Sequence, residues 1–295
     1  MAFIRANGIV LHHQVLGRPD GPALVFINSL GSDFRIWQEV APAFLESCRV
    51  VLYDKRGHGL SDAPPAPYTM DDHTSDLLAL LDRLGIESAA LVGLSVGGMI
   101  AQRMAVRAPR RVRALALCCT AARIGTAETW AERIAAVERG GIEAIVEAVL
   151  QRWFTPLFRE ARADECAGWR NMLARTPAHG YAGTCAAIRD ADLAADAARI
   201  RAPTLCVAGD QDGSTPRRLG ARHGGSHPRR ALRADQERRA HPLRRAACGS
   251  RPADRPSPPG GQDCLTRAGA SATRPAWPCA GRCWATPMWT GPALR

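Results

Sequence analysis

One serine stands in a glycine-rich segment of the kind that exposes a nucleophile. The segment G-L-S-V-G at residues 93–97 directly follows an apolar run at residues 89–92 and precedes a helical pattern. Small residues two positions before and two after a serine let the main chain turn sharply from a strand into a helix, which lifts the serine Oγ clear of the turn. The context therefore predicts that Ser95 is a nucleophile. The alternative is an ordinary glycine-rich turn.

A serine hydroxyl needs partners before it can attack a carbonyl: a base that removes its proton and donors that stabilise the oxyanion. The N–H of Val96, at the expected start of the helix, is one predicted oxyanion donor. The N–H of Leu30 is the other, in a loop that follows the apolar run at residues 23–27 and that could otherwise be a plain turn. Asp212 follows a late apolar run and is the acid expected to orient a histidine, with Asp210 as the second candidate.

These residues need a scaffold, and the first 216 residues predict an α/β fold with a mostly parallel sheet. Strands buried on both faces are typically continuous apolar runs. Strand-like runs, most of them continuous and apolar, occur at residues 9–16, 23–27, 49–53, 89–92, 112–118 and 204–208. Residues 69–84 predict a helix with Thr69 as its N-cap, Asp71 and Asp72 in its first turn, and Gly85 after its end. Alternation of strand and helix favours a parallel sheet.

The alternation is interrupted once, where residues 121–198 show a helical periodicity rich in Ala, Glu and Arg and no strand pattern. We therefore divide the chain into an α/β core at residues 1–120, a helical lid at residues 121–198, a core strand with the acid loop at residues 199–216, and a C-terminal segment at residues 217–295. The lid is expected to lie over the edge of the sheet.

The C-terminal segment, residues 217–295, differs in composition from the rest of the chain. It holds sixteen arginines against four acidic residues, so it accounts for the formal charge of +11 that the 295-residue chain carries. It contains ten prolines but no Ile, Val, Phe or Tyr, a composition that disfavours strands and a packed core. The sequence predicts that this segment is not natively folded. A basic arm that binds nucleic acid is the alternative.

Composition also excludes several classes of protein. Hydrophobic residues make up 46% of the chain, which excludes wholesale disorder. No stretch approaches the ~18 consecutive apolar residues of a membrane helix. The ten cysteines come without an export signal and without the spacing of metal ligands. We therefore expect reduced thiols, a cytoplasmic location and no metal site.

Four segments together resemble the α/β-hydrolase family. They are N-S-L-G at residues 28–31, Y-D-K-R-G-H-G-L-S-D at 53–62, G-L-S-V-G-G at 93–98 and G-D-Q-D at 209–212. The lid adds a finer resemblance, because its segments at residues 130–134, 152–156 and 180–193 are similar to the 3-oxoadipate enol-lactonases of the β-ketoadipate pathway.

The resemblance implies ester hydrolysis by a serine mechanism, with a small lactone as partner. It implies no cofactor, no nucleic acid and no membrane partner. Asp54 and His58 lie in a loop motif of the fold whose arginine and glycines shape a turn, and neither is expected to be catalytic. The lactone carries a carboxylate, which an arginine binds with two parallel hydrogen bonds, and the lid offers Arg133 and Arg152. Another serine esterase of the same fold is the alternative function.

The histidine that the family uses as its base is missing from the expected place. The family loop Gly-His-Ile-Pro-Cys-Val-Glu-Gln-Pro does not occur in the sequence. The remaining candidates, His223, His227 and His241, stand among arginines. As written, the chain has a nucleophile and an acid but no family base, which makes a catalytically impaired product an open alternative.

The genetic code offers an explanation for the missing histidine. Codons read from the second base between residues 237 and 247 permit Asn-Ala-Gly-His-Ile-Pro-Cys-Val-Glu-Gln-Pro. Codons read from the third base between residues 276 and 292 permit a segment that resembles the start of 4-carboxymuconolactone decarboxylase. The sequence therefore predicts a lactonase–decarboxylase fusion gene whose reading frame is lost near Pro216.

Overall fold

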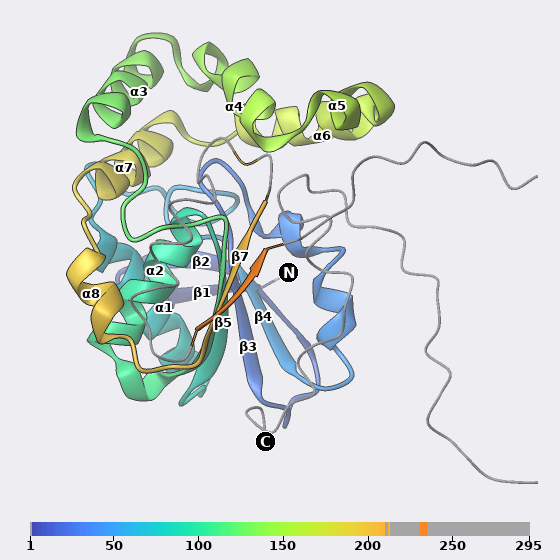
Figure 1. Ribbon diagram of the computed structural model, residues 1–295, viewed down its shortest axis with the longest axis vertical. Helices are drawn as coiled ribbons and strands as arrows, with labels where there is room; N and C mark the ends of the chain where they lie inside the picture. Colours follow the sequence, from blue (N-terminus) through green and yellow to red (C-terminus); the bar gives the residue numbers. More distant parts are fainter. Residues whose placement is uncertain (1, 210–211, 213–229, 235–295) are drawn as a thin grey trace, which may run out of the picture.

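The computed structural model describes residues 2–209, 212 and 230–234. The strands in this part of the chain form one twisted sheet with helices around it (Figure 1), in the order β1-β2-β4-β3-β5-β6-β7-β8. Their bounds are β1 Ala2–Ala6, β2 Ile9–Gly17, β3 Ala23–Ile27, β4 Arg49–Tyr53, β5 Ala89–Leu94, β6 Val112–Cys118, β7 Thr204–Ala208 and β8 Arg230–Ala234. Strand β2 pairs antiparallel with β1 and β4, and the other neighbouring pairs are parallel. The predicted α/β fold with a mostly parallel sheet is confirmed.

The central strands are buried on both faces, as their continuous apolar sequences predict. Consecutive side chains of a strand point to opposite faces. In β3, Leu24 and Phe26 belong to a buried cluster with Trp37, whereas Val25 and Ile27 belong to a second, larger cluster. Each face of the sheet therefore has its own hydrophobic core.

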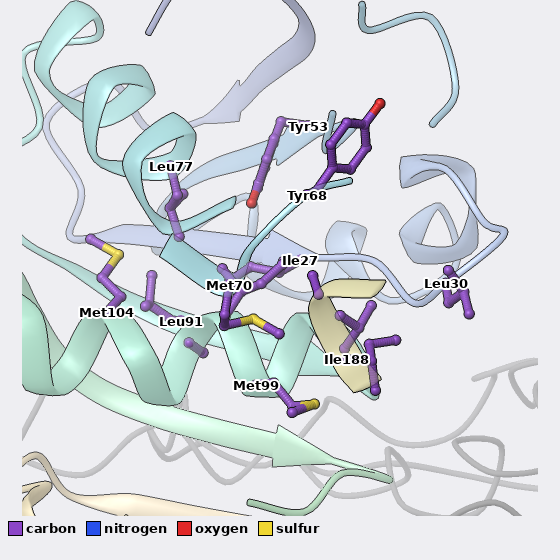
Figure 2. Close-up of a cluster of buried hydrophobic side chains, with 14 of the residues drawn as sticks. Ile27, Leu30, Tyr53, Tyr68, Met70, Leu77, Leu91, Met99, Met104 and Ile188 are labelled. Atoms are coloured by element: carbon purple, nitrogen blue, oxygen red, sulfur yellow. The ribbon is translucent and has the colours of Figure 1, made fainter. Parts of the chain in front are cut away.

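Helices α1 (Met70–Arg83) and α2 (Val96–Arg107) pack on the face of the larger cluster. Figure 2 shows Ile27 and Leu91 of the sheet next to Leu77 of α1 and to Met99 and Met104 of α2. The 3-10 helices η1 (Phe34–Trp37) and η2 (Ala41–Phe44) contribute to the cluster on the other face. Because α2 is packed firmly on the sheet, it holds the residue at its N-terminus in a defined place.

Local side chains set the ends of α1 where the sequence predicts them. The Oγ1 of Thr69 accepts a hydrogen bond from the N–H of Asp72 at 3.1 Å, and the Asp72 carboxylate accepts one from the N–H of Thr69 at 2.8 Å. At the other end, Gly85 has a φ of +64°, the left-handed conformation that favours glycine after a helix. The predicted N-cap and helix end are confirmed.

Only helices connect β6 to β7 through residues 121–198, every one of which the structure describes. They are α3 Ala127–Gly140, η4 Ile142–Ala144, α4 Val146–Trp153, α5 Pro156–Ala161, α6 Ala163–Ala174, α7 Ala178–Arg189 and α8 Ala194–Arg199. Helices α3 to α7 lie together at one end of the sheet, and α8 lies beside α1 and α2 (Figure 1). The aromatic ring of Tyr181, in α7, packs close to Gly31 in the loop after β3.

One strand lies in the segment for which the sequence predicts none. Strand β8 pairs parallel with β7, with Thr204 opposite Arg230 and Ala208 opposite Ala234. Main-chain groups make the hydrogen bonds of a ladder, so a segment without β-branched residues can still pair, and an edge strand has a neighbour on one side only. The rest of the C-terminal segment lies outside the described residues.

Candidate active site

Ser95 lies at the turn between β5 and α2, in a conformation that side chains rarely adopt. Its φ is +55° and its ψ is −119°. The main chain around it is tied to the segment after β6: the N–H of Ser95 donates to the Cys118 carbonyl at 2.9 Å, and the hydroxyl of Thr120 donates to the Ser95 carbonyl at 2.7 Å. Strain of this kind costs about 1–3 kcal/mol and persists where the surroundings enforce it. The side chain remains partly exposed.

The glycines on either side of Ser95 are required by close approach of the main chain. A Cβ on Gly93 would collide with the Gly97 carbonyl oxygen, and a Cβ on Gly97 would collide with the Ile27 carbonyl oxygen at the end of β3. The sharp turn from strand into helix thus brings three main-chain segments into contact. This is the geometry that the spacing of glycines around the serine predicts.

The loop with Leu30 lies at the same edge of the sheet, because β3 and β5 are parallel neighbours with Ile27 opposite Gly93. A turn carries Leu30: the N–H of Ser32 donates to the Ser29 carbonyl at 3.4 Å, and Gly31 has a φ of +73°. Within the described part of the chain, the N–H groups of Leu30 and Val96 donate to no protein acceptor. Both predicted oxyanion donors are therefore available to a ligand.

Asp212 lies four residues beyond the end of β7 and is buried, with 6% of its surface exposed. Strands β5, β6 and β7 are parallel neighbours, with Leu94 opposite Cys118 and Cys118 opposite Val207. The strands that precede Ser95 and Asp212 thus end at the same edge of the sheet, and two inter-strand spacings, about 10 Å, separate β5 from β7. The second candidate, Asp210, lies outside the described residues.

His58, which is not expected to be catalytic, directly contacts the loop at residues 28–32, here called the oxyanion loop after the predicted donor Leu30. It is fully buried, its Nε2 accepts a hydrogen bond from the N–H of Gly31 at 2.9 Å, and its Nδ1 donates to the Arg56 carbonyl at 3.1 Å. These partners require the neutral ring with its proton on Nδ1. Burial, with repulsion from Lys55, holds the pKa of His58 well below its ordinary value. With both nitrogens engaged, His58 is not placed to act as the base.

Asp54 keeps the role that the sequence predicts for it, since its carboxylate binds its own loop and a neighbouring one. It accepts hydrogen bonds from the N–H of Phe34 at 2.8 Å and from the N–H of Leu60 at 3.0 Å. Its Oδ2 also lies 2.7 Å from the Nδ1 of His12. Burial raises the pKa of Asp54. These contacts hold the loop after β4 in place.

The two lid arginines lie in different surroundings. The guanidinium of Arg133, in α3, lies 5.1 Å from the centre of the Trp130 ring, and its charge opposes the rise that burial causes in the pKa of Tyr181. Tyr181 in turn packs close to Gly31, in the loop that carries Leu30. Arg152, in the last turn of α4, is exposed. Arg133 therefore lies near Tyr181, which packs against the loop that carries Leu30, whereas Arg152 lies at the surface.

The candidate bases His223, His227 and His241 lie outside the described residues. In the described part of the chain, no group of three or more His, Cys, Asp or Glu side chains is arranged to hold a metal ion. No helix in that part is long and apolar enough to cross a membrane.

Acid is expected to destabilise the fold through two buried histidines. His58 and His73 are both buried, and burial, with repulsion from Lys55, holds each pKa well below its ordinary value. Below pH ~6.5 the unfolded chain binds a proton at each position and the folded chain does not, so stability falls as the pH falls. Between pH 7.5 and pH 5.5 we expect each histidine to contribute a loss of roughly 1 kcal/mol in denaturant unfolding.

A His73→Leu variant separates one of these contributions. Within the described part of the chain, neither ring nitrogen of His73 has a hydrogen-bond partner, so leucine removes the proton linkage without breaking a hydrogen bond. The variant should lose roughly 1 kcal/mol less than the parent chain over the same pH interval. An equal loss in both proteins would contradict the assignment to His73.

Comparison with known proteins agrees with this geometry. A model of the α/β hydrolase fold matches residues 22–230. The chain therefore belongs to the α/β-hydrolase family of enzymes, and the resemblance seen in the sequence is confirmed. The 3-oxoadipate enol-lactonases 2 and 1 of Acinetobacter baylyi are each 38% identical to the chain, over 71% and 70% of it and over 78% and 77% of their own lengths. The crystal structure of the enol-lactonase from Burkholderia xenovorans LB400 is 36% identical, covers 79% of this chain and 91% of its own, and has a TM-score of 0.78.

Proposed function

We propose that this chain hydrolyses 3-oxoadipate enol-lactone to 3-oxoadipate, a step of the β-ketoadipate pathway of aromatic catabolism. The observation that supports this most is the strained turn at Ser95, which is followed directly by Val96. The loop with Leu30 follows the neighbouring parallel strand, and within the described residues the N–H groups of Val96 and Leu30 donate to no protein acceptor. That arrangement suits attack on an ester carbonyl. The identity to two enol-lactonases favours the lactone among the esters that such a site could take.

In the proposed mechanism, the Oγ of Ser95 attacks the lactone carbonyl while a base removes its proton. The N–H groups of Leu30 and Val96 stabilise the oxyanion of the tetrahedral intermediate. The C–O bond of the ring then breaks, and the leaving enolate takes a proton and becomes the ketone, so ring opening is easier than for an alkyl ester. Water then hydrolyses the acyl-enzyme by the same steps. In a chain that carries the family histidine, Asp212 orients that histidine as the base, and no cofactor takes part.

We propose that the reaction takes place in the cytoplasm. The described cysteines are Cys48, Cys118, Cys119, Cys166, Cys185 and Cys206, and all of them are free thiols. Free thiols are typical of the reducing cytoplasm. The proposed partner is the small lactone alone.

The experiment that tests the function compares substrates on the full-length chain. Without its base, such a site still accelerates the reaction by roughly 10³–10⁴ over water, because oxyanion donors and binding remain. We expect a measurable kcat/KM for the enol-lactone that exceeds the value for simple aryl esters. A higher kcat/KM for neutral aryl esters would instead support a general esterase of the same fold.

Arg133 is proposed to bind the carboxylate of the lactone. An Arg133→Met variant removes a hydrogen bond to a charged group, which is worth about 1.5–3 kcal/mol. We therefore expect KM for the enol-lactone to rise by about 10- to 100-fold, with KM for a neutral aryl ester unchanged. The matched control is Arg152→Met, which removes an exposed arginine of the same region and should leave both values unchanged. If neither variant raises KM for the lactone, the carboxylate is bound elsewhere.

A further inference from the structure

Lys55 is the only lysine in a chain with 39 basic residues, and it is buried, with 1% of its surface exposed. Lysine side chains are almost never fully buried unless they have a partner. Lys55 follows the last residues of β4 and therefore lies at the edge of the sheet where Leu30 and Ser95 lie. A buried ammonium group at this edge requires an explanation.

The partners of Lys55 are main-chain carbonyls of the oxyanion loop. Its Nζ donates to the Ser29 carbonyl at 2.5 Å and lies 3.5 Å from the Ser32 carbonyl. The Ser29 carbonyl belongs to the same peptide unit as the N–H of Leu30. Because a trans peptide is planar, its C=O and N–H point in opposite directions. Holding the carbonyl toward Lys55 thus directs the N–H of Leu30 away from the loop interior.

The next peptide unit is held as well. The N–H of Gly31 donates to the Nε2 of His58 at 2.9 Å, and the Ser29 carbonyl also accepts from the hydroxyl of Ser32 at 3.0 Å. The peptide units before and after Leu30 are therefore both fixed by buried side chains. The N–H groups of Gly31 and Ser32 are thus engaged, whereas that of Leu30 donates to no acceptor within the described structure.

We propose that Lys55 is a positioning residue that orients and polarises the Ser29–Leu30 peptide, so that the N–H of Leu30 becomes an effective oxyanion donor. This rests on the proposed function, since it assigns the N–H of Leu30 a role in ester hydrolysis. A donor on the carbonyl oxygen draws electron density from the amide and strengthens its N–H as a donor. A compact ammonium group suits two neighbouring carbonyls, whereas the planar guanidinium of arginine does not.

The kinetic test uses the full-length chain with Lys55→Met. The residual rate of a chain without its base depends on the oxyanion donors, and the loss of one such donor costs about 10²–10³ in kcat. For a misdirected donor we expect kcat to fall by about 10- to 100-fold, for the enol-lactone and for an aryl ester, with KM within about twofold of the parent value. A folded variant with unchanged kcat would overturn the proposal.

The matched control is Arg49→Met. Arg49 begins the same strand, at the opposite edge of the sheet, and its guanidinium donates to the Leu84 carbonyl at 3.0 Å. Its loss removes a similar hydrogen bond far from Ser95 and should leave kcat unchanged. An oxyanion forms during the hydrolysis of any ester. If the chain hydrolyses aryl esters but not the lactone, the proposed substrate is wrong, and Lys55→Met can still be tested on the aryl esters.

A second measurement does not depend on the variant. The chain contains one Ser-Leu dipeptide, Ser29–Leu30, so labelling with [¹³C′]serine and [¹⁵N]leucine gives a single NMR correlation from the peptide in question. [¹⁵Nζ]lysine labelling gives a single signal from Lys55. In the parent chain, we expect the peptide correlation to shift with the same midpoint as the lysine signal when pH is varied.

Several titratable groups surround the ammonium group of Lys55. Burial lowers the pKa of Lys55, while Asp54 and Asp33 act in the opposite direction, and His58 and His73 lie close enough to be affected by its charge. The [¹⁵Nζ]lysine signal reports the midpoint of the amine itself, so the peptide correlation is compared with that midpoint. A peptide correlation that does not respond to titration of the lysine would overturn the proposal even if Lys55→Met fails to fold.

Discussion

A chain with the second-base frame restored from about Arg217 is expected to hydrolyse the enol-lactone with a kcat roughly 10⁶ above that of the chain as written. The restored frame permits a histidine whose codon straddles Ala240 and His241, followed by the family loop. Members of a catalytic triad act as a unit, so the absence of the base removes nearly all that the three contribute. The measurement is kcat of the two purified proteins on the same lactone preparation.

Two variants of the restored protein test the assignment. Ser95→Ala and replacement of the restored histidine by alanine should each return kcat to about the level of the chain as written, because either loss disables the same unit. Asp212→Ala should cost less, on the order of 10⁴. The frame explanation fails if the chain as written is fully active and loses its activity in His241→Ala, since His241 would then be the base.

Gly97→Ala is expected to destabilise the fold by about 3 kcal/mol or more and to lower the activity of the molecules that remain folded. The added Cβ would collide with the Ile27 carbonyl oxygen, a main-chain atom that cannot move aside as a flexible side chain can. Relief of the collision requires α2 to move away from β3. Ser95 precedes that helix, and a displacement of about 1 Å at a catalytic group can cost roughly 10²-fold in rate.

Gly168→Ala is the matched control for this substitution. Gly168 lies within α6, and among the described residues no atom other than those of its chain neighbours and of the helix backbone lies within 4 Å of the place its Cβ would take. Alanine there should stabilise the protein by about 0.5–1 kcal/mol, because glycine is the poorer helix former. Denaturant unfolding of the two variants measures the difference. A Gly97→Ala protein as stable as the parent chain would show that the helix does not need this close approach.

The sequence by itself determined most of the sheet and the turn at Ser95, because both depend on neighbouring residues. A strand buried on both faces must be apolar at consecutive positions, so β3, β4, β6 and β7 have the bounds that their apolar runs predict. The N-cap of α1 joins Thr69 and Asp72, which are three residues apart. The sharp turn before α2 requires small residues at fixed spacing, and the sequence displays them.

Contacts between distant segments decided what the sequence left open. Lys55 meets the carbonyl of Ser29, 26 residues earlier, only because β3 and β4 are parallel neighbours whose loops leave the sheet at the same edge. Arg133 and Arg152 look alike in sequence, but contact between α3 and α7 places Arg133 beside Tyr181 and leaves Arg152 exposed. The composition of the C-terminal segment disfavours a strand, but β8 pairs with the main chain of β7. Such pairings depend on which surfaces the folded sheet brings together, and the local sequence does not specify them.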